Sequence, residues 1–279
     1  MKRKLLLVLA ACAAIGTACQ TVETTKGGTV GVDRQQRMAV SAEEVNAGAA
    51  KAYSQMMAEA QKKGALDRDP AQVARVKAIV SRLVPQTAAF RADAAKWPWE
   101  VHVVSIDEVN AWCMPGGKMA IYTGLINKLG ATDDEIAAVM GHEIAHALRE
   151  HSREQISQQV GVQTGIGIVG ALFGIGELGQ NIGGLVADVT LLKPKSRAME
   201  TESDRIGVEL AARAGYDPNA AVRLWEKMAS KAGGGQPPQW LSTHPSHERR
   251  IADLKEYAAK VMPLYAAAKG GSAAVGGTK

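Results

Sequence analysis

Apolar and polar residues follow two periods along this chain, and these periods predict helices around a short group of strands. Apolar positions three and four residues apart predict a helix over 133–149, and a similar pattern predicts another over 200–211. Alternating apolar residues predict a strand over 99–106. The turn Pro115-Gly116-Gly117 predicts a hairpin of 111–114 with 118–123. We therefore expect a mainly helical α+β fold, with a short β-sheet beside the helix over 133–149.

Capping residues mark where several of these helices begin. Ser41 with Glu44, and Thr132 with Glu135, each form a capping box. Asp69-Pro70 places an N-cap residue before a proline in the first helical position. These signals predict helices over 41–63 and 69–84, and the turn at 215–218 precedes one over 219–230.

The helix over 133–149 carries the most informative chemistry, the HExxH sequence His142-Glu143-Ile144-Ala145-His146. Residues four apart lie on one helix face, so both imidazoles can reach one metal ion. Glu143 is then placed to act on a water molecule at that metal. This pattern is typical of zinc metallopeptidases. The alternative is an ordinary buried helix with two unrelated histidines.

A zinc peptidase needs a third protein ligand, and the helix over 200–211 offers acids for it. Glu200 and Asp204 share one helix face, whereas Glu202 points away from both. We assign Glu200 as the third ligand and Asp204 as an acceptor that orients a ligand imidazole. The alternative for each acid is a solvated helix face.

Further motifs extend the pattern to a known family. HExxH followed by Glu-x-x-x-Asp resembles the HtpX and CAAX-prenyl-protease family of zinc metallopeptidases, and within it the periplasmic LoiP and BepA-like lipoprotein branch. The segment 110–117, Asn-Ala-Trp-Cys-Met-Pro-Gly-Gly, resembles a strand and turn of that family. The segment 243–246, Thr-His-Pro-Ser, with Arg250 downstream, resembles another. Ser203 stands where the family commonly has alanine. The similarity runs from about Ser41 to Tyr257.

The resemblance implies a zincin-like metallopeptidase domain over 41–265 that binds one zinc ion through His142, His146 and Glu200. Glu143 would be the general base. It also implies that His244 lies near the metal, as an oxyanion stabiliser or a gate, with Arg250 as its partner. The implied reaction is endopeptidic hydrolysis of unfolded or misassembled cell-envelope proteins. The ligand types by themselves also suit other divalent ions.

Peptidases of this kind commonly hold substrate as a strand added to a sheet edge. The candidate edge comprises Ala111, Trp112, Cys113 and Met114. The alternative is a merely structural hairpin. Cys113 lies in an apolar strand pattern, which favours an inert thiol in the core over a nucleophile.

The first residues resemble a lipoprotein signal. Residues 1–19 combine a basic start, an apolar run too short to span a bilayer, and Cys19. We expect lipidation at Cys19, with Cys12 as the alternative and a cleaved signal without lipid as another. The expected location is the bacterial periplasm, lipid-anchored at the outer membrane, with 20–40 as a tether. Outer-membrane assembly machinery would be a further partner.

Two other segments have unusual composition. Residues 160–192 are apolar and rich in glycine, which favours a buried helical hairpin that forms a lid or wall over the zinc cleft. A transmembrane helix is the alternative. Residues 266–279 are rich in alanine and glycine and are predicted to be disordered.

Charge and composition exclude one class of function. The formal net charge is +5, but Lys2, Arg3 and Lys4 supply three of these charges, and no basic block remains. Aromatic residues make up 4% of the chain, so neither phosphate binding nor base stacking is indicated. We therefore expect no nucleic-acid partner. Two alternatives to a peptidase stay open: a chaperone or assembly adaptor with a latent, His-gated protease site, and a zinc-stabilised binding module without catalysis.

Overall fold

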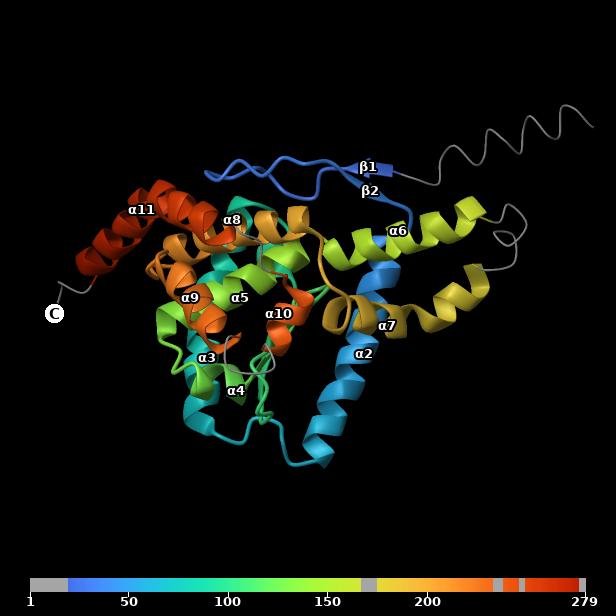
Figure 1. The fold of residues 1–279 in the computed structure, drawn as a ribbon, viewed down its shortest axis with the longest axis horizontal. Coiled ribbons are helices and arrows are strands. Elements are labelled where there is room, and N and C mark those ends of the chain that lie inside the picture. The colour runs from blue at the N-terminus through green and yellow to red at the C-terminus, as the bar shows by residue number, and fades with distance from the viewer. Residues whose placement is uncertain (1–19, 167–174, 233–237, 246–248, 276–279) are drawn as a thin grey trace, which may run out of the picture.

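The computed structural model describes residues 20–166, 175–232, 238–245 and 249–275. Helices dominate, and one of them lies in the middle of the molecule with other helices around it (Figure 1). The helices are α2 (Ala42–Lys62), α3 (Pro70–Leu83), α4 (Thr123–Lys128), α5 (Asp133–Leu148), α6 (His151–Ile166), α7 (Ile175–Leu191), α8 (Arg197–Arg213), α9 (Ala220–Ala232), α10 (Gln239–Thr243) and α11 (Arg250–Val275). The strands are β1 (Gln20–Val22), β2 (Gln36–Met38), β3 (Glu100–Val104), β4 (Ala111–Met114) and β5 (Lys118–Tyr122), and two 3₁₀ turns occupy Val84–Ala89 and Ala94–Lys96. The mainly helical α+β class expected from the sequence is confirmed.

The predicted caps form as hydrogen bonds. The Ser41 hydroxyl accepts from the backbone N–H of Glu44 at the start of α2, and Thr132 does the same for Glu135 at the start of α5. Asp69 Oδ1 accepts from the N–H of Ala71, 2.9 Å away, before α3. Each bond satisfies an N–H that the first helical turn leaves without a partner, which is why these short sequence signals locate helix starts well.

The three-stranded sheet has the order β3-β5-β4, with β5 in the centre. The predicted hairpin is confirmed as the antiparallel pair β4–β5, and β3 pairs with β5 in parallel. Alternation along β4 sends Ala111 and Cys113 into the core around α5, and Trp112 and Met114 into a second core against α2 and α7. The sheet therefore separates two hydrophobic cores and supports α5 from one side.

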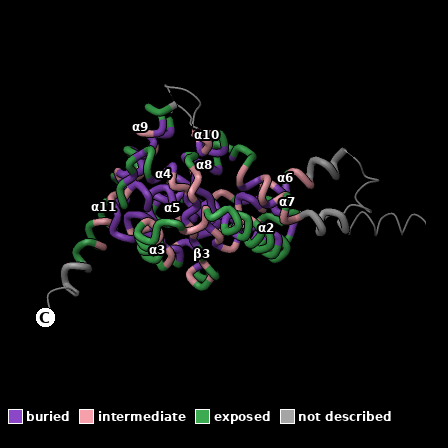
Figure 2. Tube along the Cα trace, turned by 90° about the horizontal axis from the view of Figure 1, so that it is seen from below, coloured by how far each residue is buried: buried purple, intermediate pink, exposed green. Residues whose placement is uncertain are grey.

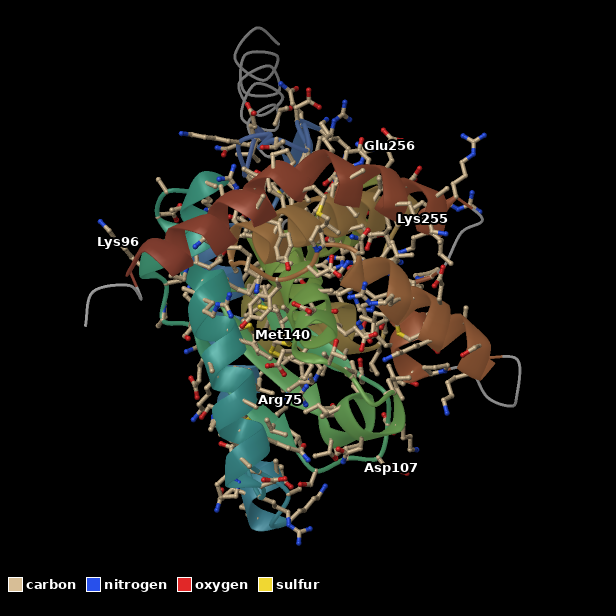
Figure 3. The ribbon with its side chains drawn as sticks, turned by 90° about the vertical axis from the view of Figure 1, so that its left-hand side faces the viewer. Arg75, Lys96, Asp107, Met140, Lys255 and Glu256 are labelled. Atoms are coloured by element: carbon tan, nitrogen blue, oxygen red, sulfur yellow. The ribbon has the colours of Figure 1, made fainter. Side chains whose placement is uncertain are left out.

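Helix α5 is the central helix, and α8 packs directly against it. Met140 of α5 is fully buried and lies in the middle of the molecule, whereas Lys255 and Glu256 lie on the outer face of α11 (Figure 3). A Cβ on Gly207 would lie 2.7 Å from the backbone nitrogen of His142, and one on Gly141 would lie 2.8 Å from the carbonyl oxygen of Gly207. The two helix backbones thus touch at glycines, next to the HExxH sequence.

Residues 20–40 fold against the body of the protein, which differs from the predicted tether. Strands β1 and β2 pair in antiparallel fashion, and the segment lies along one side of the molecule beside α6 and α8 (Figure 1). Val30, Val32 and Met38 are at most 3% exposed. Burial of these apolar side chains favours a folded segment, a contribution that its polar, glycine-rich composition concealed.

The glycine-rich segment 160–192 contains the end of α6 and all of α7, on either side of residues 167–174, which lie outside the described part. Helix α7 packs on α2, where a Cβ on Gly48 would lie 2.8 Å from Ile182. No helix in the described residues combines the length and apolar character that crossing a membrane requires. Helix α11 continues to Val275, past the predicted start of the disordered tail, and its residues 259–270 are largely exposed (Figure 2).

Candidate metal centre and active site

Helices α5 and α8 bring the three predicted ligands together. The Nε2 atoms of His142 and His146 are 3.1 Å apart. Glu200 Oε1 lies 3.4 Å from His146 Nε2, and Glu200 Oε2 lies 3.6 Å from His142 Nε2. Ligands at zinc–nitrogen distances of 2.0–2.1 Å in a tetrahedron are about 3.3 Å apart, so this spacing fits one zinc ion.

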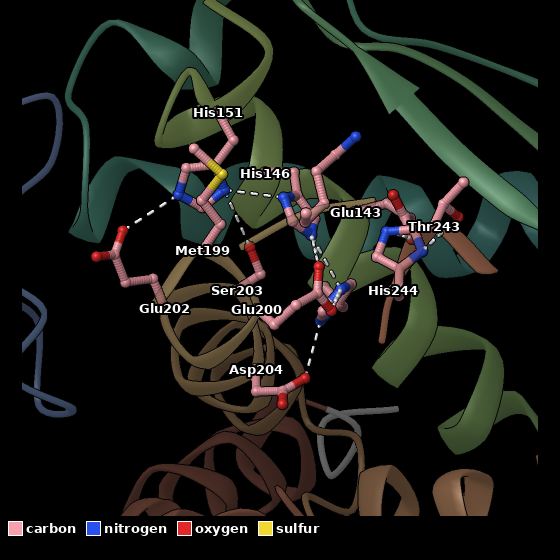
Figure 4. Close-up of polar contacts among 12 residues, drawn as sticks. Glu143, His146, His151, Met199, Glu200, Glu202, Ser203, Asp204, Thr243 and His244 are labelled. Carbon is pink, nitrogen blue, oxygen red and sulfur yellow. Dashed lines mark hydrogen bonds and ion pairs between the residues drawn. The ribbon is translucent and has the colours of Figure 1, made fainter. Parts of the chain in front are cut away.

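His244 completes a four-residue cluster. One ligand atom from each of His142, His146, Glu200 and His244 lies within 4.8 Å of the others, and all four residues are buried (Figure 4). Glu200 Oε1 and His244 Nε2 have no hydrogen-bond partner among the described residues. Buried polar atoms are normally paired, so these two indicate a missing partner, and a metal ion would supply it.

The protonation states of two residues of the cluster, His146 and Glu200, suit metal binding. Burial, together with the nearby His142 and His151, lowers the pKa of His146 well below its usual value and leaves a neutral imidazole. Burial would raise the pKa of Glu200, but the charges of His244 and Arg250 outweigh it and lower the pKa. A neutral imidazole and a carboxylate are donors that zinc prefers.

Glu143 lies beside the cluster and is buried. Its Oε1 accepts a hydrogen bond from Trp240 Nε1 at 2.8 Å and is 3.4 Å from His244 Nε2. Burial raises the pKa of Glu143 to about 7, despite the opposing effects of His142 and Trp240. A carboxylate with a pKa near neutrality can both accept and return a proton at physiological pH.

Asp204 and Arg250 support the cluster from the side of α8. Asp204 Oδ1 is 2.9 Å from His142 Nδ1, the geometry expected of an acceptor that orients this ring. Arg250 donates to Glu200 Oε2 at 2.7 Å and to Asp204 Oδ1 at 2.8 Å, and its guanidinium lies 3.7 Å from the Trp225 ring centre. Arg250 is fully buried, and these contacts fit a residue that holds Glu200 and Asp204 better than one that contacts substrate.

The structure brings to the site four residues that were not expected there from the sequence. His151 is fully buried, with Nδ1 2.8 Å from His146 Nδ1, although its position five residues on predicts the opposite face. The helix breaks at Glu150, whose φ is +51°, so the chain turns and brings His151 back. Glu202 bonds to His151, and Trp240 and Lys195 lie close to Glu143. Two weak signals for these contacts exist in the sequence: the short spacing between His146 and His151, and the acid Glu202 on α8.

Strand β4 occupies the predicted position at the edge of the three-stranded sheet. Its four residues are all buried. Just before the strand, the carbonyl of Val109 accepts a hydrogen bond from the backbone N–H of Trp240. Burial raises the pKa of the Cys113 thiol well above its usual value, which agrees with an inert side chain. The role of this strand in binding substrate stays a prediction. Cys19 lies outside the described residues, and its lipidation stays a prediction as well.

Comparisons with known proteins agree with this chemistry. The model of Peptidase family M48 matches residues 70–258. Mitochondrial metalloendopeptidase OMA1 of Schizosaccharomyces pombe is 35% identical over 179 residues, which cover 64% of this chain and 52% of the relative. OMA1 of Arabidopsis thaliana is 41% identical over 152 residues, covering 54% of this chain and 30% of the relative. The Escherichia coli β-barrel assembly-enhancing protease is 29% identical over 209 residues, covering 71% and 41%. The chain thus matches no more than about half the length of these relatives.

The same comparisons contradict the predicted location. The matched relatives from yeasts, cattle, zebrafish, human and Arabidopsis are named as mitochondrial proteins, which does not agree with a lipid-anchored protein of the bacterial periplasm at the outer membrane. The prediction rested on residues 1–19 and on the resemblance to a periplasmic branch of the family. A basic start followed by an apolar run is a weak guide, because targeting segments of several kinds begin with positive charges.

The family model covers more than half of the chain, and the HExxH helix, the acid on α8 and the fitted spacing of their ligand atoms all fall within it. A zinc requirement, metalloprotease activity and the mainly helical zincin-like fold go together in this family. The chain belongs to Peptidase family M48.

Proposed function

We propose that this member of Peptidase family M48 is a zinc metalloendopeptidase that hydrolyses unfolded or misassembled proteins. His142, His146 and Glu200 would be its zinc ligands, and Glu143 its general base. The convergence of the ligand atoms of these three residues beside a buried carboxylate carries the proposal. A purely structural zinc site has no need of an acid in the position of Glu143, which argues against a binding module without catalysis.

The residues around the cluster would have separate roles in hydrolysis. Zinc, when bound, polarises the scissile carbonyl and makes a water molecule more acidic. Glu143 accepts the proton of the attacking water and passes it to the leaving amine. Trp240 orients Glu143, and Asp204 with Arg250 orient His142 and Glu200. The imidazole of His244 can donate to the developing oxyanion.

The sheet and the relatives support the choice of substrate. An extended chain that pairs with the edge strand β4 would be held through backbone hydrogen bonds, which select unfolded segments rather than a sequence. One matched relative is named for assembly of β-barrels, which supports cell-envelope proteins as substrates and assembly machinery as a partner. The motifs at 110–117 and 243–246 support placement in the HtpX-like branch of the family.

A second function is favoured by the burial of the cluster. Glu143, His142, His146, Glu200 and His244 are each at most 5% exposed, so a substrate cannot reach them in this arrangement. His244 occupies the position that a water or substrate oxygen needs at a catalytic zinc ion. We therefore also propose a latent protease, closed by His244, that can act as a chaperone or assembly adaptor while it is closed.

Cleavage of unfolded casein and zinc content separate these functions when measured on the purified protein, Glu143→Gln and His244→Ala. An active peptidase cuts, loses on the order of 10²–10⁴-fold activity in Glu143→Gln, and retains one zinc ion in both forms. A latent protease cuts slowly as wild type and faster as His244→Ala. If all three proteins hold zinc and none cuts, the peptidase proposal is wrong.

A further inference from the structure

The second nitrogen of His146 has an unusual partner. Nε2 faces the metal cluster, and Nδ1 lies 2.8 Å from Nδ1 of His151, a buried residue from the start of α6. The other ring nitrogen of His151 lies 3.1 Å from Glu202 Oε2 (Figure 4). Metal-bound histidines usually donate this proton directly to a carboxylate or a carbonyl, as His142 does to Asp204. For His146, the imidazole of His151 lies between the ring and the carboxylate of Glu202.

The proton positions along this chain follow from the role of Nε2. A lone pair on His146 Nε2 requires the proton on Nδ1, which donates to His151 Nδ1. His151 then carries its own proton on Nε2 and donates it to Glu202. Each ring nitrogen of the two histidines is therefore either a donor or an acceptor, with no second choice. Glu202 thus fixes the tautomer and the ring orientation of His146 through His151.

Glu202 is itself held by two arginines. The Arg149 Nε donates to Glu202 Oε2 at 2.9 Å, and Arg34 bonds to both carboxylate oxygens. Arg34 also donates to both oxygens of Glu154, at 2.6 and 2.9 Å. Arg34 comes from the segment between β1 and β2, more than a hundred residues from every other member of this group.

The N-terminal segment is tied to the same group at further points. Arg149 donates to the carbonyl of Arg34 at 2.7 Å and to the hydroxyls of Thr24 and Thr25 at 3.2 Å. Gln36 is fully buried and donates to the carbonyl of Arg149 at 2.7 Å. These bonds fix the position of Arg34 relative to α6 and α8.

We propose that the N-terminal segment, residues 24–36, is a positioning element of the metal site, which acts from Arg34 through Glu202 and His151 on the ring of His146. This inference rests on the proposed function in one respect, the role of His146 as a ligand. It gives the segment a part in metal binding, although it lies outside the stretch 70–258 that matches the family.

Zinc affinity, measured by competition with a chromophoric chelator, tests the inference on the full chain. We expect Arg34→Gln and His151→Phe each to weaken zinc binding by about 10–100-fold. Arg37→Gln removes an exposed arginine three residues away on β2 and should leave the affinity unchanged. The double variant Arg34→Gln/His151→Phe should bind zinc about as well as His151→Phe alone, because both changes break the same series of hydrogen bonds.

Cobalt substitution adds a readout that simple loss of stability would not move. The visible absorption of bound Co²⁺ reports its ligand geometry, so it should shift in Arg34→Gln and stay unchanged in Arg37→Gln. Equal zinc affinities for the two arginine variants, or additive losses in the double variant, overturn the inference. His146→Ala must lose zinc binding in the same assay; if it retains zinc, the proposed ligand set is wrong instead.

Discussion

Lys195 is a buried lysine close to the cluster of proposed metal ligands. Its Nζ donates to the carbonyls of Val189, Thr190 and Lys193, and its backbone N–H donates to Thr243, next to His244. Burial lowers the pKa of Lys195 from 10.5 to about 8, against the attraction of Glu143 and Glu200. Between these two pH values the unfolded chain retains a proton that the folded protein has released.

The folded state is therefore stabilised as pH rises through this window, and the contribution is lost as pH falls through about 8. We predict that wild type gains about 2 kcal/mol of unfolding free energy relative to Lys195→Met from about pH 8 to pH 10. Denaturant titrations at several pH values measure it. Lys193→Met, at an exposed lysine, is the control, and the same slope in both variants would contradict the prediction.

Residue spacing was informative where a helix is regular and failed where one breaks. His142, His146, Glu200 and Asp204 could be placed because helical geometry fixes which side chains share a face. His151 could not, because the left-handed conformation at Glu150 resets the phase between α5 and α6. Arg250 was expected as the partner of His244 at the metal. Its salt bridges to Glu200 and Asp204 instead depend on a contact between α8 and α11 that no local pattern encodes.

The contact between α5 and α8 determines how far apart the ligand helices lie. Replacing Gly207 by alanine puts a methyl group against the backbone nitrogen of His142. Neither the methyl carbon nor that nitrogen can move without displacing a helix. We predict that Gly207→Ala costs about 1–3 kcal/mol of unfolding free energy and weakens zinc binding. Thermal denaturation and chelator competition measure the two effects.

Gly184 of α7 is the matched control for this prediction. Nothing lies within 4 Å of a Cβ at this position, so Gly184→Ala should stabilise the protein by up to about 1 kcal/mol through helix propensity. A Gly207→Ala protein that is as stable as wild type and binds zinc equally well would show that the two helices can separate without cost.

Helix starts were predicted well from the sequence, and the path of the N-terminal residues was not. Capping boxes act within four residues, so Ser41 and Thr132 reveal them directly. The segment 20–40 has few apolar residues, and its position depends on Arg34 and Gln36 bonding to α6 and α8. Such distant polar contacts leave no periodic signal.

At the scale of the whole molecule, the proposed metal ligands come from three separate elements of the chain. His142 and His146 belong to α5, Glu200 to α8, and His244 follows α10. Zinc binds the folded protein, in which these ligands converge, more tightly than the unfolded chain. We predict that removal of zinc with a chelator lowers the unfolding free energy by about 3 kcal/mol or more when zinc had exceeded its dissociation constant 100-fold.

Calorimetry of the zinc-loaded and zinc-free protein measures this loss. His146→Ala should melt at the same temperature with and without the chelator, which controls for other effects of the reagent. An unchanged melting temperature for wild type would mean that the four residues are held together without the metal.

The burial of His244 against the cluster also has a consequence for inhibitors. A hydroxamate must bind zinc through an open coordination position. If His244 closes the site as proposed, a hydroxamate can bind only those molecules in which the imidazole has moved away. Its apparent dissociation constant then equals the intrinsic one divided by the open fraction. Comparing hydroxamate affinity for wild type and His244→Ala therefore measures the free energy that keeps the protease closed, with no substrate in the assay.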